Sequence, residues 1–350
     1  MEFSIRKLSL LFLFHHFAIV NSIGVNYGVW GDNLPPPEQV AQFIRTRTTI
    51  DRVKIYDTDP NIIRAFAYTG ILLTVTIPNN DIPYLADIQA ARWWVRTHIL
   101  PFYPDTKIRF ICVGNEILRW GDENMIANLL PTMQSIHAAL VLEYLAEIKV
   151  TTPHSLNILA SSSPPSAATF QPQWEQSIIA PMLHFHQQTR SPFMVNPYPY
   201  FSWSPNTTRF TLFLSNPGSF DPLTGKMYYN IYDTLLDAVY SAMKRLGYGG
   251  VAIAVGEVGW PSYGGPALWQ CSPENARWHN MNVMKGKVIG VGTPLMPGRR
   301  FETYLFALFN ENKKPGDEDE RNFGLFRPDF SSVYDIGIMR GFEKESSEIL

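Results

Sequence analysis

The sequence is poor in cysteine. Its 350 residues include only Cys112 and Cys271, which excludes a fold held together by several disulfides. Cys112 lies in an apolar run that is typical of a strand, and Cys271 lies in a segment that is typical of a loop. A single bond between the two is an alternative that nothing in the sequence supports. We therefore interpret both as free, unreactive thiols.

Positive charge is also scarce. Lys and Arg number 29 against 31 Asp and Glu, which gives a net charge of -2. Basic residues gather no further than pairs, such as 299–300 and 313–314, and such pairs are typical of solvated surface. Because binding to nucleic acid requires a basic face, we expect no nucleic-acid partner.

Several motifs that carry catalysis are missing. The sequence has no His-Glu-x-x-His zinc motif and no Gly-x-Ser-x-Gly nucleophile turn. His184 and His186 are two residues apart, so on a helix they would point in different directions. We therefore expect no metal and no cofactor.

Long apolar runs are absent except at the N-terminus. Residues 8–20 form an apolar stretch that follows Arg6 and Lys7 and precedes the small Ser22. This order predicts a secretory signal peptide over residues 1–22, and the stretch is too short for a membrane span. We expect no other membrane-spanning segment, and residues 341–350 form a polar tail without the apolar end of a lipid-anchor signal. The acceptor sequon at Asn206 fits a secreted loop.

Between these ends, short apolar strands alternate with helical stretches. We predict strands at 23–27, 52–56, 72–77, 109–113, 148–152, 193–196, 251–255 and 303–309, and helices that include 87–100, 124–142, 174–186 and 229–246. This alternation predicts an α/β fold over residues 23–340, a single-domain (β/α)8 TIM barrel. A doubly wound sheet is the competing fold, but no Gly-x-Gly-x-x-Gly turn follows the first strand.

Two finer predictions concern the second half of the chain. In the helix at 229–246, Ile231, Leu235, Val239 and Met243 recur every four residues and are predicted to form one apolar stripe. Residues 198–226 are rich in Pro, Asn and Ser and are predicted to form an irregular loop over the carboxyl-terminal face of the barrel.

Two glutamates stand at the ends of predicted strands. Glu116 follows Val113-Gly114-Asn115, and Glu257 follows Ala254-Val255-Gly256. In a barrel both positions converge on the carboxyl-terminal face, where catalytic residues gather. Two carboxylic acids that face one cleft are the minimal equipment for hydrolysis of a glycosidic bond. The alternative is that each glutamate is a solvent-facing strand end or half of an ion pair.

Polar neighbours accompany the two acids. The amide of Asn115 could bind a sugar 2-hydroxyl, although a plain turn residue is an equal alternative. Glu311, Lys314 and Glu320 follow the eighth predicted strand and could tune the charge of the acids. By itself that segment is more typical of an exposed charged loop.

At this point a family resemblance emerges over residues 23 to about 338. The segments that carry it are 24–28 (Gly-Val-Asn-Tyr-Gly), 53–57 (Val-Lys-Ile-Tyr-Asp), 113–116 (Val-Gly-Asn-Glu), 163–166 (Ser-Pro-Pro-Ser), 196–201 (Asn-Pro-Tyr-Pro-Tyr-Phe), 257–262 (Glu-Val-Gly-Trp-Pro-Ser) and 308–316 (Leu-Phe-Asn-Glu-Asn-Lys-Lys-Pro-Gly). Their order resembles that of the plant endo-β-1,3-glucanases of glycoside hydrolase family 17.

The resemblance implies a secreted, retaining endo-1,3-β-glucanase with Glu116 as proton donor and Glu257 as nucleophile. Its substrate would be callose or a fungal-type glucan, and its location the cell wall or the vacuole. We expect a monomer. The resemblance makes Glu311, Lys314 and Glu320 supporting charges, and it makes the following residues candidates for the cleft: Tyr27, Tyr56, Asn196, Tyr198, Phe201 and Trp260.

The chain departs from the family pattern beside the predicted nucleophile. Gly256 and Val258 stand where Ser or Thr is usual, and Lys54 stands where Arg is commoner. The loss of two hydroxyls leaves open a glucan-binding protein with weakened catalysis. A mixed-linkage glucanase and a transglycosylase are further alternatives, because linkage preference depends on the shape of the groove.

Overall fold

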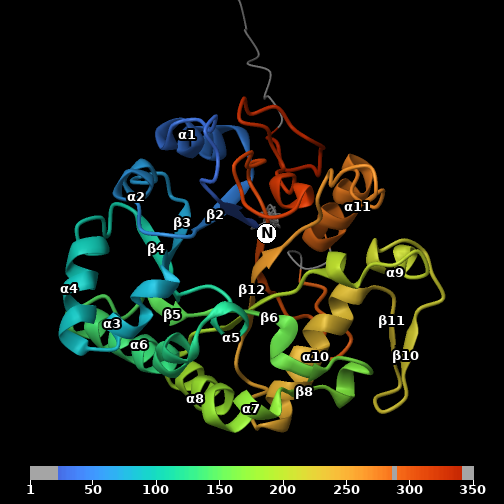
Figure 1. The fold of residues 1–350 in the computed structure, drawn as a ribbon, viewed down its shortest axis with the longest axis horizontal. Helices are drawn as coiled ribbons and strands as arrows, with labels where there is room; N and C mark the ends of the chain where they lie inside the picture. The colour runs from blue at the N-terminus through green and yellow to red at the C-terminus, as the bar shows by residue number, and fades with distance from the viewer. Residues whose placement is uncertain (1–22, 286–289, 341–350) are drawn as a thin grey trace, which may run out of the picture.

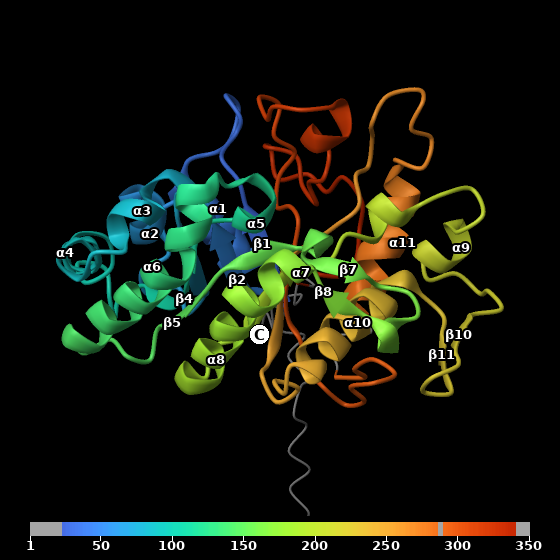
Figure 2. The ribbon, with the colours of Figure 1, turned by 60° about the horizontal axis from the view of Figure 1, so that its bottom comes forward.

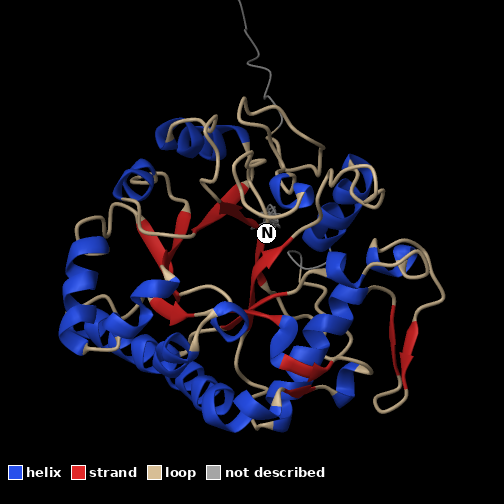
Figure 3. Cartoon of the chain, in the orientation of Figure 1, coloured by secondary structure: helices blue, strands red, loops and turns tan. Residues whose placement is uncertain are grey.

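The structure, a computed structural model, describes residues 23–285 and 290–340. The predicted signal peptide and polar tail therefore lie outside the described residues. Parallel strands form a central barrel, and helices surround it (Figures 1 and 3). This arrangement confirms the predicted single-domain TIM barrel.

The barrel is one nine-stranded sheet in the order β5-β4-β3-β2-β1-β13-β12-β9-β6. Its strands are β1 (Ile23–Tyr27), β2 (Ile50–Ile55), β3 (Leu72–Ile77), β4 (Lys107–Val113), β5 (Lys149–Thr151), β6 (Pro153–Ser155), β9 (Phe193–Asn196), β12 (Ile253–Val258) and β13 (Glu302–Leu305). All are short, and β1, β3, β4, β9 and β12 are mostly apolar, as expected for strands that are buried on both faces.

The fifth predicted strand is divided in two. β5 pairs with β4 and β6 pairs with β9, and only Thr152 separates the two segments. Pro153 has no N–H to donate to a neighbouring strand, which explains why pairing changes sides there. The two edges of the sheet are therefore consecutive pieces of chain, and the covalent chain closes the barrel.

The eighth predicted strand is shorter than expected. β13 ends at Leu305, although the N–H groups of Phe306 and Leu308 still donate to β12 and β1. Beyond Leu305 the chain also exchanges backbone hydrogen bonds with residues 323–326. The N–H of Ala307 donates to Phe323, and the N–H of Phe326 donates to Leu308. This second partner orients the loop that carries Glu311 and Lys314.

The outer layer is helical. It comprises α1 (Pro37–Arg47), α2 (Pro60–Ala65), α3 (Ile82–Leu85), α4 (Ile88–His98), α5 (Ile117–Trp120), α6 (Glu123–Leu142), α7 (Pro172–Trp174), α8 (Ala180–Thr189), α9 (Thr208–Thr211), α10 (Ile231–Arg245) and α11 (Pro273–Val283). Acidic side chains cap two of the predicted helices: Asp87 accepts from the N–H groups of Gln89 and Ala90, and Asp122 accepts from that of Met125.

α6 is long and apolar enough to cross a membrane, by length and composition alone. This differs from the expectation of no further candidate. Its buried residues include Leu129, Met133, Ile136 and Leu140, which recur at helical spacing. α6 packs against α3 and α4 as part of the outer layer, so this finding is weak evidence for a membrane span.

Three details differ from the predictions for the second half of the chain. Ile231, Val239 and Met243 are buried as predicted, but Leu235 is only half-buried, and its neighbour Leu236 is fully buried instead. Residues 198–226 are not wholly irregular, since they contain α9 and β10 (Ser219–Asp221), which pairs with β11 (Lys226–Tyr228). The predicted helix at 174–186 begins with a π-helical turn over Glu175–Ile179.

Cys112 and Cys271 are both buried and free. The interpretation as free thiols is confirmed, and the alternative of a bond between them is wrong.

Candidate active site

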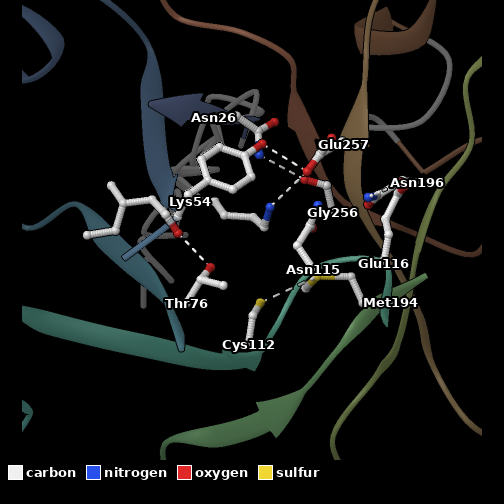
Figure 4. Close-up of polar contacts among 12 residues, drawn as sticks. Asn26, Lys54, Thr76, Cys112, Asn115, Glu116, Met194, Asn196, Gly256 and Glu257 are labelled. Carbon is white, nitrogen blue, oxygen red and sulfur yellow. Dashed lines mark hydrogen bonds and ion pairs between the residues drawn. The ribbon is translucent and has the colours of Figure 1, made fainter. Parts of the chain in front are cut away.

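A cavity of about 520 Å³ opens at the carboxyl ends of the barrel strands. Both Glu116 and Glu257 line it, together with these residues expected from the sequence: Tyr56, Asn115, Asn196, Tyr198, Phe201, Glu311, Lys314 and Glu320. Figure 4 shows Asn115 and Glu116, which follow β4, with Asn196 of β9 and Glu257 of β12. The closed barrel thus gathers residues as far apart in the sequence as Tyr56 and Glu320.

Glu257 is held by three donors. Its Oε1 accepts from Lys54 Nζ at 3.1 Å and from Tyr56 Oη at 2.9 Å, and its Oε2 accepts from Tyr198 Oη at 2.9 Å. The side chain of Lys54 is fully buried. These contacts fix both carboxylate oxygens and stabilise negative charge on them.

The backbone of β12 aims Glu257 at the cavity. The strand continues three residues beyond its predicted end, and its pairing register with β13 shifts between Val255 and Val258. Such irregularities re-aim side chains near active sites.

The two tyrosines act as donors because they keep their protons. Burial and the charge of Glu257 raise the pKa of Tyr56 and of Tyr198 well above the usual value. Each hydroxyl therefore remains a hydrogen-bond donor to Glu257 throughout the ordinary pH range.

Glu116 lies in an unusual backbone conformation. Its φ is 54° and its ψ is 40°, the left-handed region that non-glycine residues seldom adopt. Two contacts hold this turn: the Glu116 N–H donates to Pro153 O at 2.9 Å, and Asn79 clamps the preceding residue. Asn79 Oδ1 accepts from the Asn115 N–H at 2.8 Å, and Asn79 Nδ2 donates to Asn115 O at 3.2 Å.

The carboxyl group of Glu116 has weaker partners than that of Glu257. Its Oε1 accepts from Asn196 Nδ2 at 3.0 Å, its Oε2 accepts from Trp120 Nε1 at 3.2 Å, and Arg119 Nη1 lies 3.9 Å from Oε2. Burial, followed by the negative charge of Glu257, raises the pKa of Glu116, while Asn196, Arg119 and Trp120 oppose the shift. Glu116 therefore keeps its proton to higher pH than an ordinary glutamate does.

Three buried asparagine oxygens at the site have no protein partner among the described residues. They are Oδ1 of Asn26, Asn115 and Asn196. A buried polar atom without a partner is costly unless something else binds it. Of the three residues, Asn115 and Asn196 line the cavity, so a polar ligand could satisfy them.

The charged segment after β13 also reaches the cavity. Glu311 is buried, its Oε1 accepts from the Trp30 N–H at 2.9 Å, and burial raises its pKa. Its carboxyl packs directly against the backbone of Gly28, a space that any side chain at that position would fill. Lys314 Nζ pairs with Glu320 at 2.9 Å and lies 4.1 Å above the centre of the Phe306 ring.

Two of the predicted cleft residues do not line this cavity. Trp260 is fully buried, its Nε1 donates to Gln270 O, and its ring packs edge-on against Tyr200. Tyr27 is 2% exposed and borders a smaller neighbouring hollow. Both side chains belong to the hydrophobic core instead, where burial of a large ring is favourable.

Sequence reasoning missed several residues of the cavity. Trp30 and Trp120 are 59% and 67% exposed, and both line it together with Arg119. Exposed rings at the mouth of a polar cavity are suited to stacking against sugar rings. The signal that could have found Arg119 and Trp120 is their place in the turn after Glu116. In the sequence, only its departure from a family pattern distinguishes Lys54.

The departure at Gly256 has a structural counterpart. A side chain there would start 2.8 Å from both Met194 Sδ and Asn196 Oδ1. Met194 thus occupies the space that a hydroxyl at residue 256 would need. Val258 is fully buried in β12.

Within residues 23–285 and 290–340, no group of three or more His, Cys, Asp or Glu side chains could hold a metal ion.

Known proteins share this sequence and fold. Residues 23–338 match the family described as glycosyl hydrolases family 17. The chain is 50% identical over 323 residues to a glucan endo-1,3-beta-glucosidase of Triticum aestivum, which covers 91% of this chain and 70% of that protein. It is 43% identical over 349 residues to glucan endo-1,3-beta-glucosidase 7 of Arabidopsis thaliana, which covers 97% and 69%.

Comparison with a solved structure shows the same similarity in three dimensions. CJP38, a beta-1,3-glucanase and allergen of Cryptomeria japonica pollen, superposes with a TM-score of 0.86 at 38% identity, over 91% of this chain and 99% of that one. The chain therefore belongs to family 17 of the glycosyl hydrolases.

Proposed function

We propose that this chain hydrolyses internal 1,3-β-D-glucosidic bonds of β-glucans and retains the anomeric configuration. The main support is the contrast between two acids in one cavity. Three donors hydrogen-bond both carboxyl oxygens of Glu257, whereas burial and the charge of Glu257 raise the pKa of Glu116. Retaining glycosidases need one acid of each kind, about 5 Å apart. The similarity to glucan endo-1,3-beta-glucosidases supports the substrate class.

In the first step, Glu116 donates its proton to the glycosidic oxygen as a Glu257 oxygen attacks the anomeric carbon. The bond from that carbon to the glycosidic oxygen breaks, the leaving chain departs as an alcohol, and the remaining sugar is esterified to Glu257. The charge of Glu116 is now negative, so it can accept a proton in the next step.

In the second step, Glu116 takes a proton from water while the water oxygen attacks the anomeric carbon. The ester bond breaks, Glu257 leaves as a carboxylate, and Glu116 is again protonated. Two inversions at the same carbon give net retention. Lys54, Tyr56 and Tyr198 stabilise the charge that returns to Glu257.

The other cavity residues position the sugar. Asn115, with its unpaired amide oxygen, is suited to bind the 2-hydroxyl next to the reacting carbon. Trp30, Trp120 and Phe201 offer exposed rings for stacking. Glu311, Lys314 and Glu320 form a charged wall beside the acids.

We further propose that the chain is secreted to the cell wall or the vacuole and that its natural substrate is callose or a fungal wall glucan. The charged start and apolar centre of residues 1–22 support secretion.

The test is to incubate the purified mature chain with laminarin and to separate the products over time. We expect a ladder of short 1,3-linked oligosaccharides and no ladder from Glu257→Gln, whose fold and glucan binding are retained. Intact laminarin with folded wild-type protein would favour the binding-protein alternative. Products longer than the substrate would favour transglycosylation, and near-normal activity of Glu257→Gln would remove Glu257 from the mechanism.

A further inference from the structure

A second hollow lies beside α2, α3 and α4, which stand together on one side of the barrel (Figures 1 and 2). It encloses about 460 Å³, and neither Glu116 nor Glu257 borders it. Tyr84 and Trp93 form part of its wall and are 65% and 59% exposed. Trp94, the next residue of α4, is instead buried at 4%. α4 therefore uses one tryptophan for the core and leaves its neighbour facing solvent at this hollow.

Single exposed aromatic rings are ordinary on protein surfaces. Here two exposed rings and the buried ring of Trp94 border the same hollow, together with the carboxylates of Asp57, Asp59 and Asp81. Backbone contacts orient two of these acids: Asp57 Oδ1 accepts from the Asp59 N–H at 3.0 Å, and Asp59 Oδ1 accepts from the Asn61 N–H at 2.8 Å. Flat rings beside fixed hydrogen-bond acceptors match the two faces of a sugar, which presents C–H groups and hydroxyl donors.

This hollow is linked to the catalytic cavity. A third, smaller hollow of about 250 Å³ shares Gly28, Trp30 and Tyr56 with the catalytic cavity and shares Asp57 with the second hollow. The three depressions therefore follow one another over the carboxyl ends of β1 and β2 toward α4. A polymer bound at Glu116 and Glu257 could continue along this path, whereas a short oligosaccharide would not reach its end.

We propose that Tyr84 and Trp93 form a distal binding site for the β-glucan chain, which holds the polymer beyond the sugars that surround the cleaved bond. This proposal rests on the proposed function for the identity of the polymer. The continuity with the catalytic cavity favours a neutral glucan over the other ligand that rings and carboxylates can bind, an organic cation.

The experiment compares the full mature chain with Tyr84→Ala/Trp93→Ala, and with Tyr144→Ala as a matched control. Tyr144 is 92% exposed and borders none of the three hollows. For the double variant we expect kcat/KM on long laminarin to fall about tenfold, the loss typical when a binding aromatic is truncated. On laminaritriose we expect no change, and Tyr144→Ala should match the wild type on both substrates.

An equal loss on both substrates, or no loss on the polymer, would overturn the distal site. Affinity electrophoresis in laminarin gels tests the distal site independently of the proposed function, because it measures glucan binding and needs no turnover. If the wild type cleaves nothing yet is retarded more than the double variant, the hydrolase assignment fails and the distal site stands. Calorimetry with spermidine and with laminarin tests the alternative ligand. If the wild type and the double variant differ in their affinity for spermidine but not for laminarin, the site binds cations and the proposal is wrong.

Discussion

At the scale of single residues, the two acids differ in their hydrogen-bonding and charged partners. Glu257 has a buried lysine and two phenolic donors, whereas Glu116 has one amide, one indole and a distant guanidinium. Because opposite charge and donors favour the ionised form of a carboxyl, the surroundings of each acid match the role that we propose for it.

Arg119 should set the alkaline limit of activity. Its positive charge lowers the pKa of Glu116, so Arg119→Met should raise that pKa further. The acid would then stay protonated to higher pH, and the alkaline limb of the kcat/KM profile should move upward. Arg245→Met, at the end of α10, is the control and should leave the limb in place. A downward shift in Arg119→Met would contradict the assignment of Glu116 as the proton donor.

Asn79 should matter although it does not line the catalytic cavity. Its side chain clamps both backbone groups of Asn115 and so helps to hold Glu116 in its left-handed conformation. We expect Asn79→Ala to lower kcat/KM by about a hundredfold, the scale of a 1 Å misplacement, mainly through kcat. Asn79→Asp keeps the acceptor and loses the donor, so its activity should be intermediate. Equal activity of both variants and the wild type would show that the clamp is dispensable.

At the scale of elements, β12 and β9 fit together through a glycine. Gly256 leaves room for Met194, and a side chain at 256 would also press on Asn196, the partner of Glu116. The departure from the usual Ser or Thr is therefore matched by the packing around it, and it need not weaken catalysis.

A methyl group added at residue 256 should overpack the contact between β12 and β9. We expect Gly256→Ala to lower the free energy of unfolding by about 1–3 kcal/mol, measured by urea denaturation. The control is Gly250→Ala, where nothing lies within 4 Å of the new methyl group. Combining Gly256→Ala with Met194→Ala should cost less than the sum of the two single changes. Strict additivity would mean that Met194 does not fill that space.

At the scale of the whole molecule, a chain with two free cysteines relies on its core rather than on disulfides. Burial raises the pKa of Cys112 to about 12 and also raises that of Cys271. We expect a thiol reagent at pH 8 to modify neither residue in the native protein and both residues in denaturant. Rapid modification before unfolding would mean that one of them is accessible.

The positions of the exposed aromatic rings around the catalytic cavity predict the association state. Trp30, Trp120 and Phe201 border the catalytic cavity, and a partner that covered them would also block the substrate. We therefore predict that the mature chain is a monomer, with the mass of a single chain in light scattering at micromolar concentration. A dimer mass would show that another surface mediates association.

Local patterns were enough to place the two acids. An apolar run followed by a glycine marks the end of a strand, and in a barrel of parallel strands all such ends lie on one face. Glu116 and Glu257 could therefore be predicted from their neighbours in the sequence. The same logic failed for Trp260, because the sequence position of a residue does not reveal whether its side chain faces the cavity or the core.

What the sequence determined by itself is the alternation of strands and helices, hence the barrel, and the presence of two carboxylic acids at its carboxyl-terminal face. Only the tertiary structure decided which groups surround them. Lys54 and Tyr56 lie about two hundred residues from Glu257, and Asn196 lies eighty residues from Glu116. Periodicity and capping act over a few residues, whereas these contacts depend on closure of the sheet and on how each strand end turns its side chains.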